Sequence, residues 1–180
     1  SQEGLFQHYK TIAKASPRPI ILYNVPGRTG RNMTADTTLR LAREVENIVA
    51  VKEASSDMAQ CMQLVKDKPE DFVVLSGDDE LALAQIACGF DGIISVAANY
   101  FAKDFSEMVQ LALQNNFSKA RELHYKMWEG FKLMFEENNP AGIKAFLSEA
   151  GLCNNIFRLP VVPVNPALHQ KIKSFLAQHP

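Results

Sequence analysis

The sequence is poor in cysteine and shows no spacing typical of metal ligands. It has only 3 cysteines in 180 residues, Cys61, Cys88 and Cys153, and they are odd in number and far apart. Without a CxxC pair, they favour neither a disulfide framework nor a zinc site. The 4 histidines also lack the HExxH spacing of zinc hydrolases. We therefore expect three reduced, packed thiols and a protein that uses no metal or other cofactor.

The sequence also has almost no net charge, no long apolar run and no leader-like start. Its formal net charge is -1, with no basic cluster that would attract nucleic acid or an anionic membrane. No apolar stretch approaches the roughly 18 residues that span a bilayer. Residues 1–4 do not show the basic-then-apolar pattern of a signal peptide. We expect a cytoplasmic globular protein whose partners are small neutral or anionic metabolites, and neither nucleic acid nor a membrane.

Glycine-rich nucleotide motifs are absent, and short apolar runs alternate instead with helical patterns. Four runs have the composition of buried parallel strands: residues 20–23, 48–54, 72–75 and 92–96. Single helices between them imply βαβ units, in either a doubly wound sheet or part of a (β/α)8 barrel. No GxGxxG or GxxxxGK[ST] motif follows a strand, which weakens the nucleotide-binding form of the first architecture. Polar residues collect after successive strands, where barrels keep catalytic groups, so the barrel fits better.

Turn and capping residues mark the ends of the predicted helices. Two glycines and a proline predict a loop over residues 24–30. Thr34 is expected to cap the helix that follows. Asp78 and Asp79 come just before a predicted helix over residues 80–88, so we interpret them as capping residues rather than a catalytic carboxylate pair.

After the fourth strand the chain is expected to be helical. Apolar residues at helical spacing predict a helix near residues 105–113 and a longer one over residues 117–135. Asn139, followed by proline, is the predicted cap of a further helix, and Asn165, also followed by proline, is the predicted cap of the last.

Only four strands are legible, whereas a full (β/α)8 barrel takes roughly 250 residues. The sequence therefore predicts half of a barrel over residues 1–115 and a C-terminal helical domain over residues 116–180. Four parallel strands alone would leave two outer edges unpaired, a recognised association hazard. We expect another polypeptide segment to complete the sheet.

The strand over residues 48–54 carries a lysine at its C-terminal end. A lysine at the mouth of a buried strand loses hydration, which disfavours the ammonium form and leaves a neutral amine that can act as a nucleophile. Lys52 is therefore a candidate Schiff-base lysine. The competing interpretation is that Lys52 only marks where the strand emerges into water. Glu53 is expected to point to the opposite side, because successive side chains of a strand alternate.

Four motifs stand at the strand ends: YNVPGRTG from Tyr23, VKEA around Lys52, SGDD from Ser76 and GIISV from Gly92. Their order and spacing strongly resemble the dihydrodipicolinate synthase family, over essentially the whole chain. The resemblance implies a pyruvate-dependent lyase of the class I aldolase type, and makes this chain the second half of its (β/α)8 TIM barrel with the C-terminal helices. The implied reaction condenses pyruvate with aspartate β-semialdehyde to 4-hydroxy-tetrahydrodipicolinate, the first committed step of diaminopimelate and lysine biosynthesis.

The resemblance implies roles for five residues. Lys52 would form the imine with pyruvate, and Tyr23 matches a proton-shuttling tyrosine, whose phenol can donate and accept in turn. Arg28 matches the arginine that holds the carboxylate of aspartate β-semialdehyde, a task suited to a planar guanidinium. Ile94 and Gly77 match positions whose backbone lies against the bound keto acid. The iminium is itself the electron sink, so no metal is implied.

The first half of the family's barrel is not in this sequence. In family members that half supplies a threonine pair and a further tyrosine, the tyrosine across a dimer interface, which complete the proton relay. We therefore expect this chain to be inactive alone and to need the missing N-terminal half-barrel as its partner. The complete protein is expected to be a homo-oligomer, either a dimer or a tetramer.

Two other interpretations stay open. A related class I pyruvate lyase, acting on N-acetylneuraminate or a 2-keto-3-deoxy sugar acid, would share the lysine and the tyrosine motif. Those lyases lack an arginine at the position of Arg28. Alternatively, the chain is a non-catalytic remnant that acts as a partner of a full-length homologue. The retention of Lys52, Tyr23 and Arg28 together favours a fragment of an active enzyme.

Overall fold

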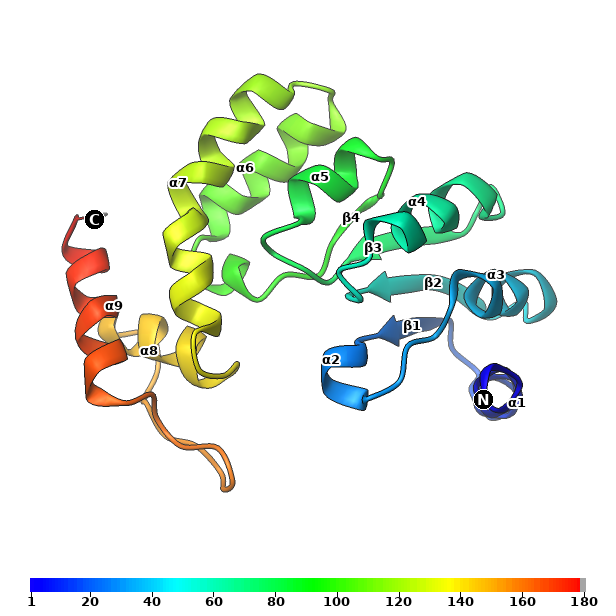
Figure 1. Ribbon diagram of the computed structural model, residues 1–180, viewed down its shortest axis with the longest axis horizontal. Coiled ribbons are helices and arrows are strands. Elements are labelled where there is room, and N and C mark those ends of the chain that lie inside the picture. The colour runs from blue at the N-terminus through cyan, green and yellow to red at the C-terminus, as the bar shows by residue number, and fades with distance from the viewer. Residues whose placement is uncertain (179–180) are drawn as a thin grey trace. The chain divides into compact units, whose positions relative to one another are not determined.

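A computed structural model describes residues 1–178, which divide into two compact units. The first unit comprises residues 1–94 and 112–115, and the second comprises residues 95–111 and the chain from residue 116 onward. The first unit contains the sheet and the second is helical (Figure 1). A domain boundary at residue 115 stays a prediction.

The first unit alternates strands with helices. Its elements are α1 (Gln2–Ala15), β1 (Ile20–Asn24), α2 (Pro26–Thr29), α3 (Ala35–Glu44), β2 (Ile48–Glu53), α4 (Met58–Asp67), β3 (Val73–Ser76), α5 (Ala82–Ala87) and β4 (Gly92–Ile93). The four strands are parallel and lie in the order β1-β2-β3-β4, so the predicted parallel sheet is confirmed. The last strand is shorter than the predicted range 92–96. Beyond Ile94 the chain turns toward the 3-10 helix η1 (Ala97–Asn99), where the Ser95 hydroxyl accepts a hydrogen bond from the Ala98 N–H at 2.8 Å.

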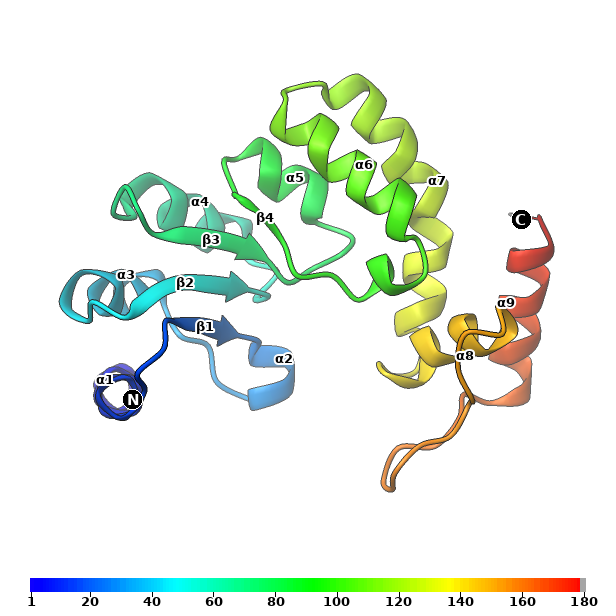
Figure 2. The ribbon, with the colours of Figure 1, turned by 180° about the vertical axis from the view of Figure 1, so that it is seen from behind.

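One face of the sheet is buried within this unit, whereas the other is only partly covered. Leu22, Val51 and Val74 are aligned across β1, β2 and β3, and each is at most 1% exposed. On the opposite face Ile21 is 50% exposed and Val73 is 37% exposed, and Figure 2 shows these strands in front of α3 and α4. Parallel sheets are normally covered on both faces. The bare apolar face is what half of a barrel would present.

Residues 24–30 were predicted as a loop, and that prediction is wrong because they contain the helical turn α2. Pro26 is its first residue, a position where the missing N–H has no helical partner to lose. Gly30 ends the turn with φ 69°, a left-handed conformation that glycine adopts without steric penalty. The same proline and glycine that suggested a loop therefore frame a short helix. The predicted cap of α3 is confirmed, since the Thr34 hydroxyl accepts from the Thr37 N–H.

α5 begins later than the predicted range 80–88, and the capping prediction for the aspartates before it is wrong. Its N-cap residue is Leu81, whose side chain makes no capping hydrogen bond. The Leu81 N–H donates to the Asp78 carbonyl, so residues 78–81 form a turn before the helix. The Asp78 carboxylate instead accepts a hydrogen bond from the Ser56 hydroxyl at 3.1 Å.

The three cysteines are free thiols in different environments. Cys61 is fully buried, and burial raises its pKa to about 12, so it is an inert packing residue. Cys88 is half-buried. Cys153 is exposed, so the prediction that all three pack in the core is wrong for Cys153.

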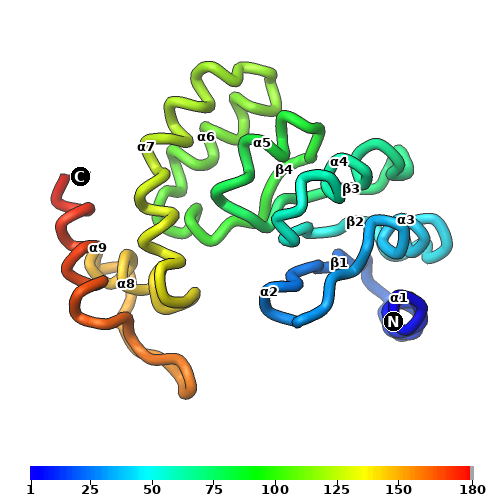
Figure 3. The backbone as a smooth tube through the Cα atoms, viewed as in Figure 1, coloured from blue at the N-terminus to red at the C-terminus, as the bar shows by residue number. Residues whose placement is uncertain are grey.

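The second unit contains η1, α6 (Ala102–Leu113), α7 (Phe117–Phe135), α8 (Ala141–Glu149) and α9 (Pro166–Gln178), although the end of α6 belongs to the first unit. The helices α7, α8 and α9 pack on one another (Figure 3). Their core contains an aromatic cluster of Phe101, Phe131, Phe146 and Phe175, in which ring centroids lie 5.9 to 6.4 Å apart. Edge-to-face aromatic pairs at this separation add to the stabilisation from buried apolar area.

Some of the predicted helix ends in this unit are confirmed and one is wrong. The long helix over residues 117–135 is confirmed at both ends. Asn165 caps α9 as predicted, because its side-chain oxygen accepts from the Leu168 N–H at 2.9 Å. The predicted cap of α8 is wrong by one residue: Pro140 is its N-cap, and the helix begins at Ala141.

The contact between α7 and α8 leaves no space for a side chain at Gly142. A Cβ atom there would overlap the backbone carbonyl of Met134. We expect Gly142→Ala to lower the free energy of unfolding by about 3 kcal/mol, the upper end of the usual overpacking cost, because backbone cannot rotate away as a side chain can. Urea denaturation measures this. Gly27→Ala is the matched control, since nothing lies within 4 Å of its added Cβ; equal loss in both variants would contradict the prediction.

Candidate active site

Lys52 and Tyr23 lie side by side on the uncovered face of the sheet. They are register partners on β2 and β1, so both side chains leave the sheet on the same side. The Lys52 Nζ atom lies 4.3 Å from the centroid of the Tyr23 ring. Tyr23 is 43% exposed and Lys52 is half-buried, so the pair is open to a small molecule from this face. The structure therefore brings the predicted nucleophile and the predicted proton-transfer group together.

Gly77 makes room for the aliphatic stem of Lys52. It directly follows β3, and its N–H donates to the Glu53 carbonyl at 2.7 Å. A Cβ atom at Gly77 would lie 2.9 Å from Cε of Lys52 and 2.7 Å from Cβ of Ala54, distances that real Cβ atoms essentially never show. A larger residue would therefore displace the lysine side chain. This packing is a reason for glycine beyond the one that the family resemblance implies.

A carboxyl group stands at the same edge of the sheet. Burial raises the pKa of Asp78 above its ordinary value, while hydrogen bonds from Ser56 and the positive charge of Lys52 act to lower it. Ser56 itself has φ 60°, an uncommon conformation for a serine. The interpretation of Asp78 as a cap missed this titratable group, because only the fold shows that Ser56, 22 residues away, reaches it.

Ile94 and Arg28 share this edge of the sheet. Ile94 directly follows β4, where its N–H donates to the Ser76 carbonyl at 3.0 Å, and its side chain is 42% exposed. Arg28 is an exposed residue of α2, which follows the C-terminal end of β1 (Figure 1). Of the other site residues, Tyr23 contacts the Lys52 amine, and Gly77 lies beside the stem of the lysine. Arg28 and Ile94 are brought to the same edge because the C-terminal ends of parallel strands meet there.

Other features of the described chain offer less chemistry. Within residues 1–178, no three His, Cys, Asp or Glu side chains are grouped so that they could hold a metal ion. No helix in that range is both long and apolar enough to cross a membrane.

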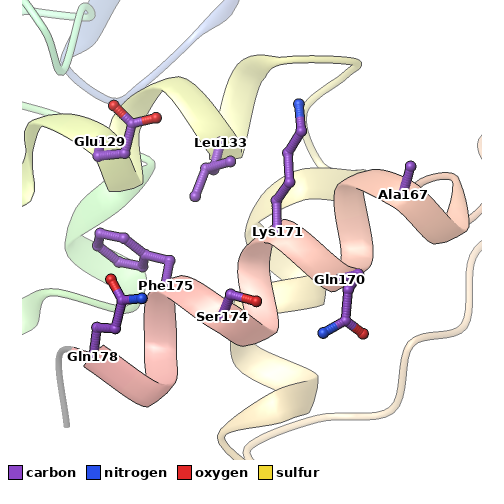
Figure 4. A pocket seen from close by; sticks show the side chains of 8 residues that line it. All are labelled: Glu129, Leu133, Ala167, Gln170, Lys171, Ser174, Phe175 and Gln178. Atoms are coloured by element: carbon purple, nitrogen blue, oxygen red, sulfur yellow. The ribbon is translucent and has the colours of Figure 1, made fainter.

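An open groove on the second unit runs between α7 and α9 (Figure 4), and its lysine, Lys171, is paired with Glu136 at 2.6 Å. The groove is lined by Glu129, Leu133, Ala167, Gln170, Lys171, Ser174, Phe175 and Gln178.

Known proteins resemble the chain over nearly its whole length. The 4-hydroxy-tetrahydrodipicolinate synthase of Phocaeicola vulgatus is 51% identical over 176 residues, which cover 98% of this chain and 59% of that protein. The protein of the same name from Parabacteroides distasonis is 49% identical over 178 residues, covering 99% of this chain and 60% of that protein. The crystal structure of dihydrodipicolinate synthase from Aquifex aeolicus matches with a TM-score of 0.97 at 41% identity, covering 99% of this chain and 61% of that one.

These matches confirm the predicted fold class and the predicted resemblance. The four parallel strands are the second half of a (β/α)8 barrel, and the C-terminal helices follow them. The chain spans about 60% of the length of the curated relatives it matches. The model of the Dihydrodipicolinate synthetase family matches residues 1–179. The chain therefore belongs to the dihydrodipicolinate synthetase family.

Proposed function

We propose that the protein containing this chain condenses pyruvate with aspartate β-semialdehyde to 4-hydroxy-tetrahydrodipicolinate through a Schiff base on Lys52. One observation carries the proposal: Lys52 Nζ lies 4.3 Å from the Tyr23 ring at the C-terminal edge of a parallel sheet, the edge where barrel enzymes place their catalytic groups. The names of the relatives support this choice of reaction.

In this mechanism the Lys52 amine attacks the ketone carbon of pyruvate, and the carbinolamine that forms loses water to give an iminium. The iminium withdraws electrons, so a proton leaves the methyl group and an enamine forms. The enamine carbon then attacks the aldehyde carbon of the semialdehyde, whose oxygen takes up a proton. The amino group of the bound second substrate attacks the iminium carbon and displaces Lys52, which returns to the free amine.

Tyr23 is the proposed proton shuttle, because a phenol can donate a proton and accept it again. Its position beside the lysine on the open face supports this role. Arg28 is proposed to bind the carboxylate of the semialdehyde through two parallel hydrogen bonds. Gly77 and Ile94 are proposed to present their backbone to the keto acid. The proposed reaction uses no metal or cofactor.

The bare face of the sheet supports a further part of the proposal. Ile21 and Val73 are apolar and exposed there, and β1 and β4 are the outer strands of the described sheet. We assign the covering of this face to an N-terminal half-barrel, which would also complete the proton relay. The 180-residue chain is accordingly inactive alone, and the complete protein is a cytoplasmic homo-oligomer.

Enzyme assays test the reaction. The full-length protein is expected to consume pyruvate and aspartate β-semialdehyde together, and to release little pyruvate from N-acetylneuraminate or a 2-keto-3-deoxy sugar acid. The 180-residue chain, assayed in parallel, is expected to show neither activity. Cleavage of a sugar acid by a protein that does not condense the semialdehyde would replace this proposal with the related lyase. An inactive full-length protein would favour the non-catalytic remnant.

A further inference from the structure

A buried carboxylate lies directly behind the candidate active site. Glu53 follows Lys52 at the end of β2, is 0% exposed and, as expected, points to the opposite face of the sheet. Its two oxygens accept hydrogen bonds from Asn24 Nδ2 at 3.0 Å each, from Gln60 Nε2 at 3.1 Å and from the Ser55 N–H at 2.7 Å. No lysine, arginine or histidine in residues 1–178 forms an ion pair with it. Neutral N–H donors from three segments therefore replace the water that the carboxylate loses on burial.

Asn24 extends this network into the segment that carries Arg28. The Asn24 side chain is 3% exposed; its Nδ2 also donates to Asn32 Oδ1 at 2.8 Å, and its Oδ1 accepts from the Met33 N–H at 3.0 Å. These bonds join the two ends of the segment over residues 25–31, which contains α2. Glu53 accepts hydrogen bonds from Asn24 on the buried face of the sheet. The strand that carries Lys52 and the segment that carries Arg28 are therefore both attached to one buried side chain.

Gln60, in the first turn of α4, takes part in the network with both ends of its side-chain amide, so the network depends on which end donates and which accepts. Its Nε2 donates to Glu53 and to the Met33 carbonyl at 3.2 Å, while its Oε1 accepts from Asn32 Nδ2 at 2.9 Å. Turning the Gln60 amide to satisfy a changed neighbour would break its bonds to the Met33 carbonyl and to Asn32 Nδ2. Replacing the Glu53 acceptor by a donor should therefore also weaken the contacts of Gln60 with Asn32 and Met33, because buried polar groups must remain paired.

From this geometry we infer that Glu53 is a positioning residue for the second substrate: it holds the segment carrying Arg28 in register with the strand carrying Lys52. The inference rests on the proposed function. Lys52 is also held by the β ladder on both sides of β2, which does not depend on the network. Loss of the Glu53 acceptor should therefore disturb the Arg28 side of the site much more than imine formation at Lys52.

Glu53→Gln in the full-length protein tests this inference, because it keeps the size of the side chain and replaces one acceptor by a donor. We expect kcat/KM for aspartate β-semialdehyde to fall about 10- to 100-fold, the effect of one or two hydrogen bonds to a charged group. Borohydride trapping of the pyruvate imine should change far less. Hydrogen exchange should speed up at the Met33 amide while the amides of β3 stay protected. Glu46→Gln is the matched control, since Glu46 is an exposed glutamate just before β2.

Asn32→Ala provides a second variant in case Glu53→Gln does not fold. Asn32 is only half-buried, and its removal leaves the Asn24-Glu53 contact in place while it opens one end of the Arg28 segment. We expect a higher KM for the semialdehyde, normal imine trapping and faster exchange at the Met33 amide.

The outcomes separate this inference from the proposed function. Unchanged exchange at Met33 and unchanged semialdehyde kinetics in both folded variants would overturn the positioning role. Equal losses in imine trapping and semialdehyde kinetics, with uniformly faster exchange, would also overturn it, because that pattern marks general destabilisation. If the wild-type protein does not condense the substrates, the proposed function fails, while local exchange at Met33 in the variants still reports whether Glu53 holds the segment.

Discussion

The Lys52→Ala variant of the full-length protein is expected to form no imine with pyruvate and to lose condensation activity by at least about 10³-fold, because no other group in the proposed mechanism can supply the nucleophile. The side chain lies beside Tyr23 at the C-terminal edge of the sheet, where barrel enzymes admit their substrates, so its removal leaves a space that solvent fills rather than a cavity in the core. The variant should therefore fold normally. Borohydride reduction with pyruvate, followed by peptide mass spectrometry, measures the adduct directly.

Two control variants test whether Lys52 acts through its amine or only through its positive charge. Lys52→Arg keeps a positive charge but has no amine that can become neutral, so it should be as inactive as the alanine variant. Lys66→Ala removes a lysine whose side chain is 80% exposed on α4 and should retain full trapping at Lys52. A reduced pyruvate adduct on another residue of the wild-type protein, or trapping that survives Lys52→Ala, would disprove the Schiff-base assignment.

The Arg28→Ala variant is expected to lose affinity for the second substrate selectively. A charge-assisted, two-bond contact with a carboxylate contributes roughly 1.5–3 kcal/mol, so kcat/KM for aspartate β-semialdehyde should fall about 10- to 150-fold. Imine formation with pyruvate should persist, because that step needs Lys52 and the proton relay only. Arg28→Lys should rescue poorly, since an ammonium cannot make two parallel bonds. Steady-state kinetics with each substrate varied in turn, beside borohydride trapping, measures the difference.

Arg31→Ala is the matched control, because Arg31 is an exposed arginine just after the same helical turn. It should leave both substrates unaffected. Unchanged semialdehyde kinetics in Arg28→Ala would mean that Arg28 does not bind the second substrate. The preference for this reaction over cleavage of sugar acids would then lose its main support.

Local patterns predicted the sheet well because each strand is a short apolar run between helical patterns, and such a run is visible within a few residues of sequence. The long helix α7 was located at both ends for a related reason, since its apolar side chains recur at helical spacing. The wrong prediction of a loop over residues 24–30 concerns residue types that are common in two kinds of local structure. Pro26 and Gly30 suit a loop and also frame the helical turn α2, and the choice between them was not visible locally.

The sequence by itself determined that Lys52 ends a buried parallel strand, that Tyr23 ends the strand before it, and that Glu53 points away from both. These conclusions depend only on side-chain alternation and strand order. The tertiary structure decided which polar groups meet: Asp78 with Ser56, and Glu53 with Asn24, whose side chains join across 29 residues of sequence. Such contacts are long-range and specific in geometry. No local periodicity encodes them, because they form only after neighbouring strands have paired and aligned their ends.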